Sequence, residues 1–117
     1  MKQDLSKRFL EFAVAVIKFL KTIPQSVENN VIRYQLTKCS SSMGANYEES
    51  QAASSKADFY NKIKISLKEA RETAYWLKIL KALRLGDQIE LDKLITESDE
   101  LKKILGSISA SQKIKSL

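Results

Sequence analysis

Hydrophobic residues recur every three or four positions along this chain, in four segments that short polar breaks separate. This period places apolar side chains on one face of an α-helix. We predict helices over residues 4–22, 27–53, 56–85 and 88–105, followed by a frayed Ser/Lys-rich tail over 107–117. Because short connections force consecutive helices to lie side by side, the pattern predicts an all-α fold, one antiparallel up-and-down four-helix bundle spanning residues 1–117.

Residues at the segment borders support these helices. Each segment is preceded by a residue whose side chain caps a helix N-terminus, namely Asp4, Ser26, Ser55 (or Ser54) and Asp87. Gly86 is expected to form a left-handed C-terminal cap for the third helix, and Gly106 to end the fourth. Gly44 lies inside the second helix, where a glycine costs about 1 kcal/mol relative to alanine. We therefore expect another helix to approach closely at Gly44.

The composition removes several kinds of chemistry. The chain has no His, so a Ser-His or Cys-His nucleophile and a typical zinc site both lack a required residue. Cys39, the only cysteine, falls among apolar residues of the second helix and is interpreted as a buried structural thiol. No segment reaches the roughly 18 uninterrupted apolar residues of a membrane span. We expect a cytoplasmic protein that is not an enzyme, needs no cofactor or metal and does not engage a membrane.

Charge is unevenly distributed between the last two predicted helices. Residues 56–84 carry eight Lys/Arg against three Asp/Glu, whereas residues 85–105 carry three against six. On the third helix one arc of roughly 80° contains four cations around an aromatic ring, namely Lys64, Lys68, Arg71, Tyr75 and Lys78. Such a face is either ordinary solvated surface or a binding face for RNA, with the cations on phosphates and the aromatic ring available for stacking.

The third helix also carries more apolar surface than one bundle seam needs. A second arc beside its core stripe contains Ile65, Trp76, Ile79 and Leu83. Either the fourth helix packs over this arc, or the arc is a subunit interface, because a small bundle would otherwise expose it as one apolar patch.

Polar residues gather on the second helix, on a face that we expect to look inward. Gln35, Ser42, Asn46 and Glu49 fall within about 60° of each other, and we interpret them, with Glu72 of the third helix, as a structural polar network. Carboxylates on facing helices also resemble the two-metal sites of ferritin-like bundles. Those sites use Glu-x-x-His motifs, which a chain without His cannot supply.

The second and third helices resemble a known family. Residues 35–50 read QLTKCSSSMGANYEES, which resembles the pattern Q-L-x-R-A-A-x-S-I-x-x-N-I-x-E-G of the four-helix bundle proteins encoded in intervening sequences of bacterial 23S ribosomal RNA genes. Residues 67–77, LKEARETAYWL, look like the third helix of the same family. The chain departs from the pattern at Ser50, where the family has Gly, at Tyr47 in place of an aliphatic residue, and at Cys39 and Ser40.

The resemblance carries its own expectations. It implies that Ser42, Asn46 and Glu49 are the polar signature of the second helix and that Glu72 is the acidic residue of the third. The family forms doughnut-shaped pentamers without an established catalytic activity, and the related accessory variability proteins of diversity-generating retroelements bind RNA and a reverse transcriptase. The resemblance therefore implies a homopentamer with a structured RNA or a ribonucleoprotein as partner. A protein-interaction scaffold without nucleic-acid binding is the alternative.

Overall fold

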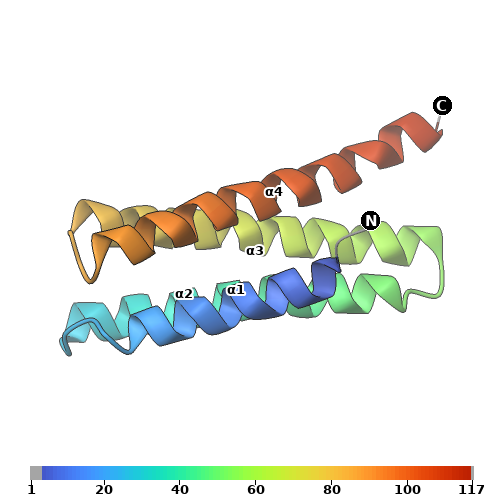
Figure 1. The fold of residues 1–117 in the computed structure, drawn as a ribbon. Coiled ribbons are helices and arrows are strands. Elements are labelled where there is room, and N and C mark those ends of the chain that lie inside the picture. The colour runs from blue at the N-terminus through green and yellow to red at the C-terminus, as the bar shows by residue number, and fades with distance from the viewer. Residues whose placement is uncertain (1–3, 117) are drawn as a thin grey trace.

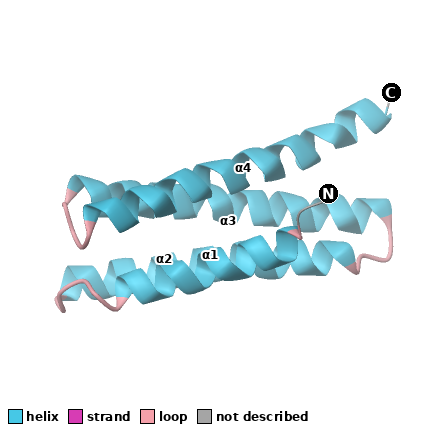
Figure 2. Cartoon of the chain, viewed as in Figure 1, coloured by secondary structure: helices cyan, strands magenta, loops and turns pink. Residues whose placement is uncertain are grey.

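A computed structural model describes the backbone of residues 4–116 and the side chains of residues 4–112. It contains four α-helices: α1 (Leu5–Leu20), α2 (Val27–Gln51), α3 (Lys56–Ala82) and α4 (Gln88–Ser116). The chain reverses direction at each connection, so that α1 lies beside α2 and α3 beside α4 in an antiparallel bundle (Figure 1). Figure 2 shows only helices and loops over the described residues. The predicted all-α four-helix fold is confirmed.

The four N-terminal caps that the sequence predicts are all present. The Asp4, Ser26 and Ser55 side chains accept hydrogen bonds from backbone N–H groups three residues later, at 3.3, 3.0 and 3.0 Å. Asp87 accepts from the N–H groups of Ile89 and Glu90 at 2.9 and 3.0 Å. Each cap satisfies donors that have no partner inside their own helix, so these residues define where the helices begin.

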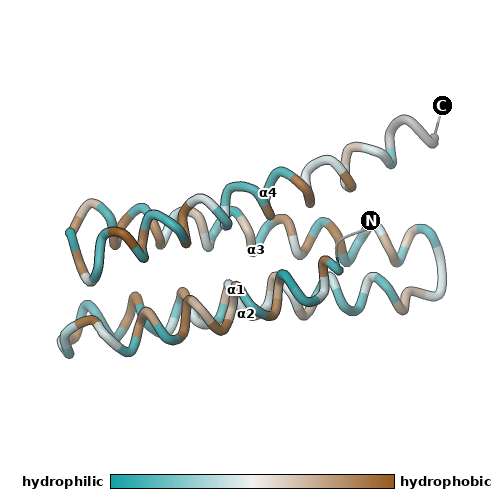
Figure 3. The backbone as a smooth tube through the Cα atoms, in the orientation of Figure 1, coloured by the Kyte–Doolittle hydropathy of each residue, from teal (hydrophilic) through white to brown (hydrophobic). Residues whose placement is uncertain are grey.

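The core is one apolar cluster of buried side chains, and hydrophobic positions, drawn in brown, recur along the helices (Figure 3). Its largest fully buried side chains come from all four helices, among them Phe9, Leu36, Leu77 and Leu101. The α2–α3 pair makes the most extensive contact and the α1–α4 pair the least. The short length of α1, 16 residues, limits the contact that this helix makes with both of its neighbours.

Gly44 allows the close helix approach that the sequence predicts. A Cβ atom placed there would lie 2.9 Å from Cβ of Phe9, closer than such atoms pack. The glycine therefore lets α2 lie directly against α1, and the burial of Phe9 offsets the poor helix propensity of glycine.

The predicted end of α3 is wrong by three residues, and Gly86 is not its cap. The helix ends at Ala82, and Arg84 adopts the left-handed conformation with φ 53°. The N–H of Arg84 bonds to the Lys81 carbonyl and that of Leu85 to the Leu80 carbonyl, both at 3.1 Å, which is a Schellman motif. Gly86 has φ 77° as well, but it lies in the loop, where a Cβ would fall 2.6 Å from the ring of Phe19.

The predicted end of α4 at Gly106 is also wrong. The helix continues through this glycine to Ser116, so residues 107–116 are helical rather than frayed, and Leu117 lies outside the described residues. Ile108 packs against the core, and the Tyr60 hydroxyl of α3 lies 3.0 Å from the hydroxyl of Ser111. These contacts favour helix past the glycine, and Figure 1 shows the end of α4 extending away from α1.

Candidate nucleic-acid interface

The predicted basic face is exposed along α3. Its five side chains all reach solvent, and Tyr75 exposes 63% of its surface. They span 15 residues, about 21 Å of a straight helix. We call them the basic row, which consists of Lys64, Lys68, Arg71, Tyr75 and Lys78.

Ion pairing separates the basic row from two of the other three cations of the same helix. Lys62 pairs with Glu49 of α2 and Lys81 with Asp92 of α4, each at 2.9 Å. The hydrogen bond to Glu49 raises the pKa of Lys62. In the described part of the chain, no cation of the basic row forms an ion pair. The cations of the row therefore have no ion-pair partner, whereas Lys62 and Lys81 join α3 to the helices on either side of it.

The helix that carries the basic row is held from two sides. Towards α2, the buried Ser66 hydroxyl donates to the Met43 carbonyl at 2.6 Å. Towards α4, Tyr60 meets Ser111. Several apolar side chains of α3, including Ile63, Leu77 and Leu80, are completely buried. The basic row thus lies on a rigid support rather than on a loop.

The polar set of α2 does not form the single buried network that we predicted. Asn46 Nδ2 donates to the backbone oxygen and to Oγ of Ser42, at 2.9 and 3.1 Å, and both residues are half-buried. Glu49 and Glu72 are exposed, and Gln35 is half-buried. The prediction of a buried network is wrong because these side chains lie towards solvent beside α3. There Glu49 pairs with Lys62 and does not enter the interior.

Five of the six buried polar residues carry small hydroxyls that sequence reasoning missed, and the sixth is Asn29. Ser40, Ser50 and Thr73 bond to carbonyls of their own helix three or four residues earlier, at 3.4, 2.6 and 2.8 Å. Ser98 is fully buried, and its Oγ has no hydrogen-bond partner among the described residues. Their signal in the sequence is a Ser or Thr on the apolar stripe of α2, α3 or α4, and residue type alone does not distinguish such a residue from a serine at the surface.

Cys39 is buried, as predicted, with 3% of its surface exposed. Burial raises the pKa of its thiol. On the facing helix, burial and the neighbouring Glu72 raise the pKa of Glu69. Among the residues that the structure describes, no three Cys, Asp or Glu side chains gather to hold a metal ion.

Antiparallel register determines which exposed or half-buried apolar residues of α2 and α3 lie at the same height along the bundle. The Glu49–Lys62 and Met43–Ser66 contacts join positions whose numbers add to 111 and 109. Val31 therefore lies level with Ile79, and Tyr34 with Trp76. These four residues and Leu83 form what we call the α2–α3 strip, in which Val31, Tyr34 and Leu83 expose 51%, 63% and 56% of their surface.

The residues of the predicted second arc of α3 differ in burial and in position along the helix. Trp76 and Ile79 are half-buried and pack against the core, whereas Leu83 is exposed at the end of the helix. Ile65 exposes 41% of its surface but lies 11 residues before Trp76, about 16 Å away along the axis. The strip is thus confined to the end of the bundle where α3 meets α4, and Ile65 lies apart from it.

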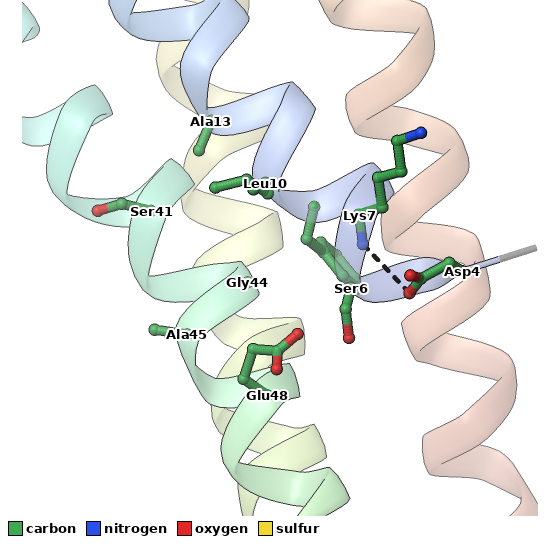
Figure 4. A pocket seen from close by; sticks show the side chains of 10 residues that line it. Asp4, Ser6, Lys7, Leu10, Ala13, Ser41, Gly44, Ala45 and Glu48 are labelled. Atoms are coloured by element: carbon green, nitrogen blue, oxygen red, sulfur yellow. Dashed lines mark hydrogen bonds between the residues drawn. The ribbon is translucent and has the colours of Figure 1, made fainter.

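A shallow groove of about 620 Å³ runs between α1 and α2 (Figure 4). Leu10 and Ala13 of α1 and the small residues Ser41, Gly44 and Ala45 of α2 line it, and Leu10 exposes 65% of its surface. Its titratable side chains are Asp4, Lys7 and Glu48. The groove is thus an open surface lined largely by apolar and small side chains.

Two arginines that sequence reasoning missed hold the short helix α1. Arg8 donates two hydrogen bonds to Glu97 of α4, at 2.9 and 2.7 Å, and one to Glu100 at 2.6 Å. The bond to Glu97 is the main reason that the pKa of Arg8 is raised. Arg33 of α2 donates to the carbonyls of Leu20 and Ile23 at 3.2 and 2.9 Å. Each arginine lies far in the sequence from the residues to which it bonds, so the helical period of three to four residues does not reveal these hydrogen bonds.

Comparison with known families decides the identity of the chain. The family described as 23S rRNA-intervening sequence protein matches residues 1–107. The chain belongs to this family. A solved structure that it resembles is a protein of unknown function from the S23 ribosomal protein family of Bacteroides thetaiotaomicron, with 35% identity, coverage of 91% of this chain and 98% of that one, and a TM-score of 0.82. Comparison with the curated proteins gives no match.

Membership in the 23S rRNA-intervening sequence protein family places its signature residues in this fold. Ser42 and Asn46 form the hydrogen-bonded pair on α2, and Glu49 forms the bridge to α3. Ser50, where the family pattern has glycine, is buried and bonds to the Tyr47 carbonyl. Within the described residues of this family member, none of the helices combines the length and the apolar character that crossing a membrane requires.

Proposed function

We propose that this 23S rRNA-intervening sequence protein is a non-enzymatic homo-oligomer that binds structured RNA or a ribonucleoprotein through the basic row. One observation carries the proposal: four cations on one rigid helix are exposed and unpaired, while Lys62 and Lys81 of the same helix are ion-paired. Unpaired cations are free to displace counterions from phosphates. The name of the family refers to an RNA gene, but the proposal depends on the charges.

The expected binding is electrostatic. If all four cations contact phosphates, the logarithm of the association constant should fall with the logarithm of salt concentration, with a slope of about −3 to −4 per subunit. An oligomer would present several rows at once, which increases avidity when an RNA can reach more than one of them. A structured RNA fits this requirement because its folded shape fixes phosphates at several positions.

The α2–α3 strip supports assembly of several copies. A partly exposed apolar strip that includes a half-buried tryptophan is typical of a subunit interface. The family resemblance implies a pentamer, and a closed ring needs two different surfaces on each copy. The groove between α1 and α2 supplies a second apolar surface, and its exposed Leu10 lies on a helix that forms no part of the strip.

Charge reversal tests the RNA proposal. A variant with Lys64→Glu, Lys68→Glu, Arg71→Glu and Lys78→Glu should lose RNA binding at low salt. The matched control reverses four other exposed lysines and changes the net charge equally, through Lys18→Glu, Lys21→Glu, Lys93→Glu and Lys103→Glu. This control should retain most binding. Equal losses in both variants would mean that net charge alone drives binding, and the basic row would then have no specific role.

Light-scattering mass tests assembly. The wild-type protein should run as an oligomer, and Leu83→Glu should dissociate it, because a carboxylate would be buried at the interface. Ile65→Glu is the control, since Ile65 lies outside the α2–α3 strip. A monomeric wild-type protein would contradict the oligomer proposal.

The second candidate function is a protein-interaction scaffold. It is favoured by the contrast between the basic α3 and the first half of α4, where residues 88–100 carry five Asp/Glu against one Lys; these two surfaces could meet across subunits or recruit another protein. A protein partner that remains bound after nuclease treatment would support the scaffold, whereas RNA that nuclease or high salt removes would support the first proposal.

A further inference from the structure

Tyr75 differs from the rest of the basic row in what it can offer a ligand. It is uncharged, exposes 63% of its surface and lies between Arg71 and Lys78, each about one helical turn away. Its hydroxyl has no hydrogen-bond partner among the described residues, and it is not part of the core. An aromatic ring in such a position contributes little to folding, so its surface is free for a ligand.

Trp76 holds the ring of Tyr75 from one side. The two ring centroids lie 6.1 Å apart with an interplanar angle of 73°, an edge-to-face arrangement. Trp76 itself is half-buried and packs against the core, so it provides a firm support. A neighbour that meets Tyr75 at a steep angle does not stack in parallel on the ring, and therefore leaves a flat surface for another planar group.

We propose that this row binds an unpaired RNA segment, with one base stacked on Tyr75 and the phosphates on either side held by Arg71 and Lys78. The inference rests on the proposed function and specifies which part of a structured RNA is recognised: a loop, bulge or single-stranded end. Lys64 and Lys68 continue the phosphate contacts along the same helix. Stacking on an aromatic ring and cation contacts to the backbone are how single strands are bound without sequence preference.

A regular RNA duplex does not satisfy this geometry. Its bases are stacked on both faces, and its deep, narrow major groove does not admit side chains to the base edges. A duplex would contact the four cations through its phosphates and would not stack a base on Tyr75. The contribution of Tyr75 therefore discriminates between an unpaired segment and a duplex.

The test compares a 12-nucleotide oligouridine with a 12-base-pair RNA duplex, using the full chain and two substitutions at Tyr75. Tyr75→Phe retains the ring, and its affinity for oligouridine should remain within twofold of wild type. Tyr75→Leu retains an apolar side chain without the ring, and it should weaken oligouridine binding about tenfold or more. Duplex affinity should change less than twofold in both variants. Emission of Trp76, the only tryptophan, should respond to oligouridine in the wild type and not in Tyr75→Leu.

The outcomes separate this inference from the proposed function. If Tyr75→Leu binds oligouridine as tightly as wild type while the fourfold charge reversal abolishes binding, the inference is wrong and the proposed function stands. Equal weakening of both probes by Tyr75→Leu would also overturn stacking. If the wild-type protein binds neither probe at low salt, both proposals are wrong. Unchanged thermal midpoints and oligomer mass of the two variants exclude misfolding as the cause of a loss.

Discussion

Two glycines of the bundle should respond in opposite ways to the same substitution. Gly44 and Gly106 both lie inside long helices, where replacing glycine with alanine gains about 1 kcal/mol from helix propensity. At Gly106 no atom lies within 4 Å of the added Cβ apart from the adjacent residues and nearby backbone of its own helix, so Gly106→Ala should stabilise the protein by about 0.5–1 kcal/mol. At Gly44 the new Cβ would meet Cβ of Phe9 at 2.9 Å.

The contact at Gly44 is costly because it involves atoms that cannot rotate away. The Cβ of Phe9 is attached directly to the backbone of α1, and the side chain is 1% exposed and packs on Tyr47 with 5.0 Å between ring centroids. Overpacking of a well-filled core costs about 1–3 kcal/mol. This exceeds the propensity gain, so Gly44→Ala should destabilise the protein by about 1 kcal/mol.

Urea unfolding followed by circular dichroism measures both effects. The two variants should differ by about 2 kcal/mol in the free energy of unfolding, with midpoints on either side of wild type. Thermal midpoints should move in the same directions, by about 3–6 °C per kcal/mol for a chain of this size. All proteins are compared at one concentration, because assembly would make stability concentration-dependent. If Gly44→Ala stabilised the protein as much as Gly106→Ala, the close approach of α1 and α2 would be refuted.

Three further predictions concern single residues. Arg8→Ala should lower the free energy of unfolding by about 1–2 kcal/mol, because it leaves Glu97 and Glu100 without their shared partner across the weakest helix pair; a chemical denaturation curve like that of wild type would contradict this role. Arg84→Gly should raise the thermal midpoint by a few degrees, since a left-handed residue with a Cβ is strained by about 1 kcal/mol; a lower midpoint would show that the Arg84 side chain is worth more than the strain. Burial raises the pKa of the Cys39 thiol, so its contribution to stability is fully present below the unfolded pKa of about 8.5 and is lost as pH rises through the folded value. Between pH 8 and 10 the stability of Cys39→Ala should therefore fall less than that of wild type, and parallel pH profiles of urea unfolding would exclude this effect.

Helix boundaries show how far local signals extend. Residues such as Ser26 and Asp87 act on backbone groups two or three positions away, so the starts of the helices could be read from the chain itself. The ends of the helices could not be read in this way, because a glycine favours the end of a helix only weakly. At Gly106 tertiary contacts of Ile108 and Ser111 outweigh that preference, and at Arg84 the Schellman hydrogen bonds outweigh the strain of a left-handed non-glycine residue.

The sequence by itself determined the helices, the bundle, the exposed basic row and the family, because these depend on periodicity, capping and motif, all of which are local properties of the chain. Only the tertiary structure decided which polar groups are buried and which cations are paired. Glu49 is exposed because α2 is rotated so that this side chain meets Lys62 of α3. Lys62 is thereby ion-paired, whereas the cations of the basic row are not. Pairing of this kind depends on the rotation and register of helices packed together, which helical periodicity within one segment does not contain.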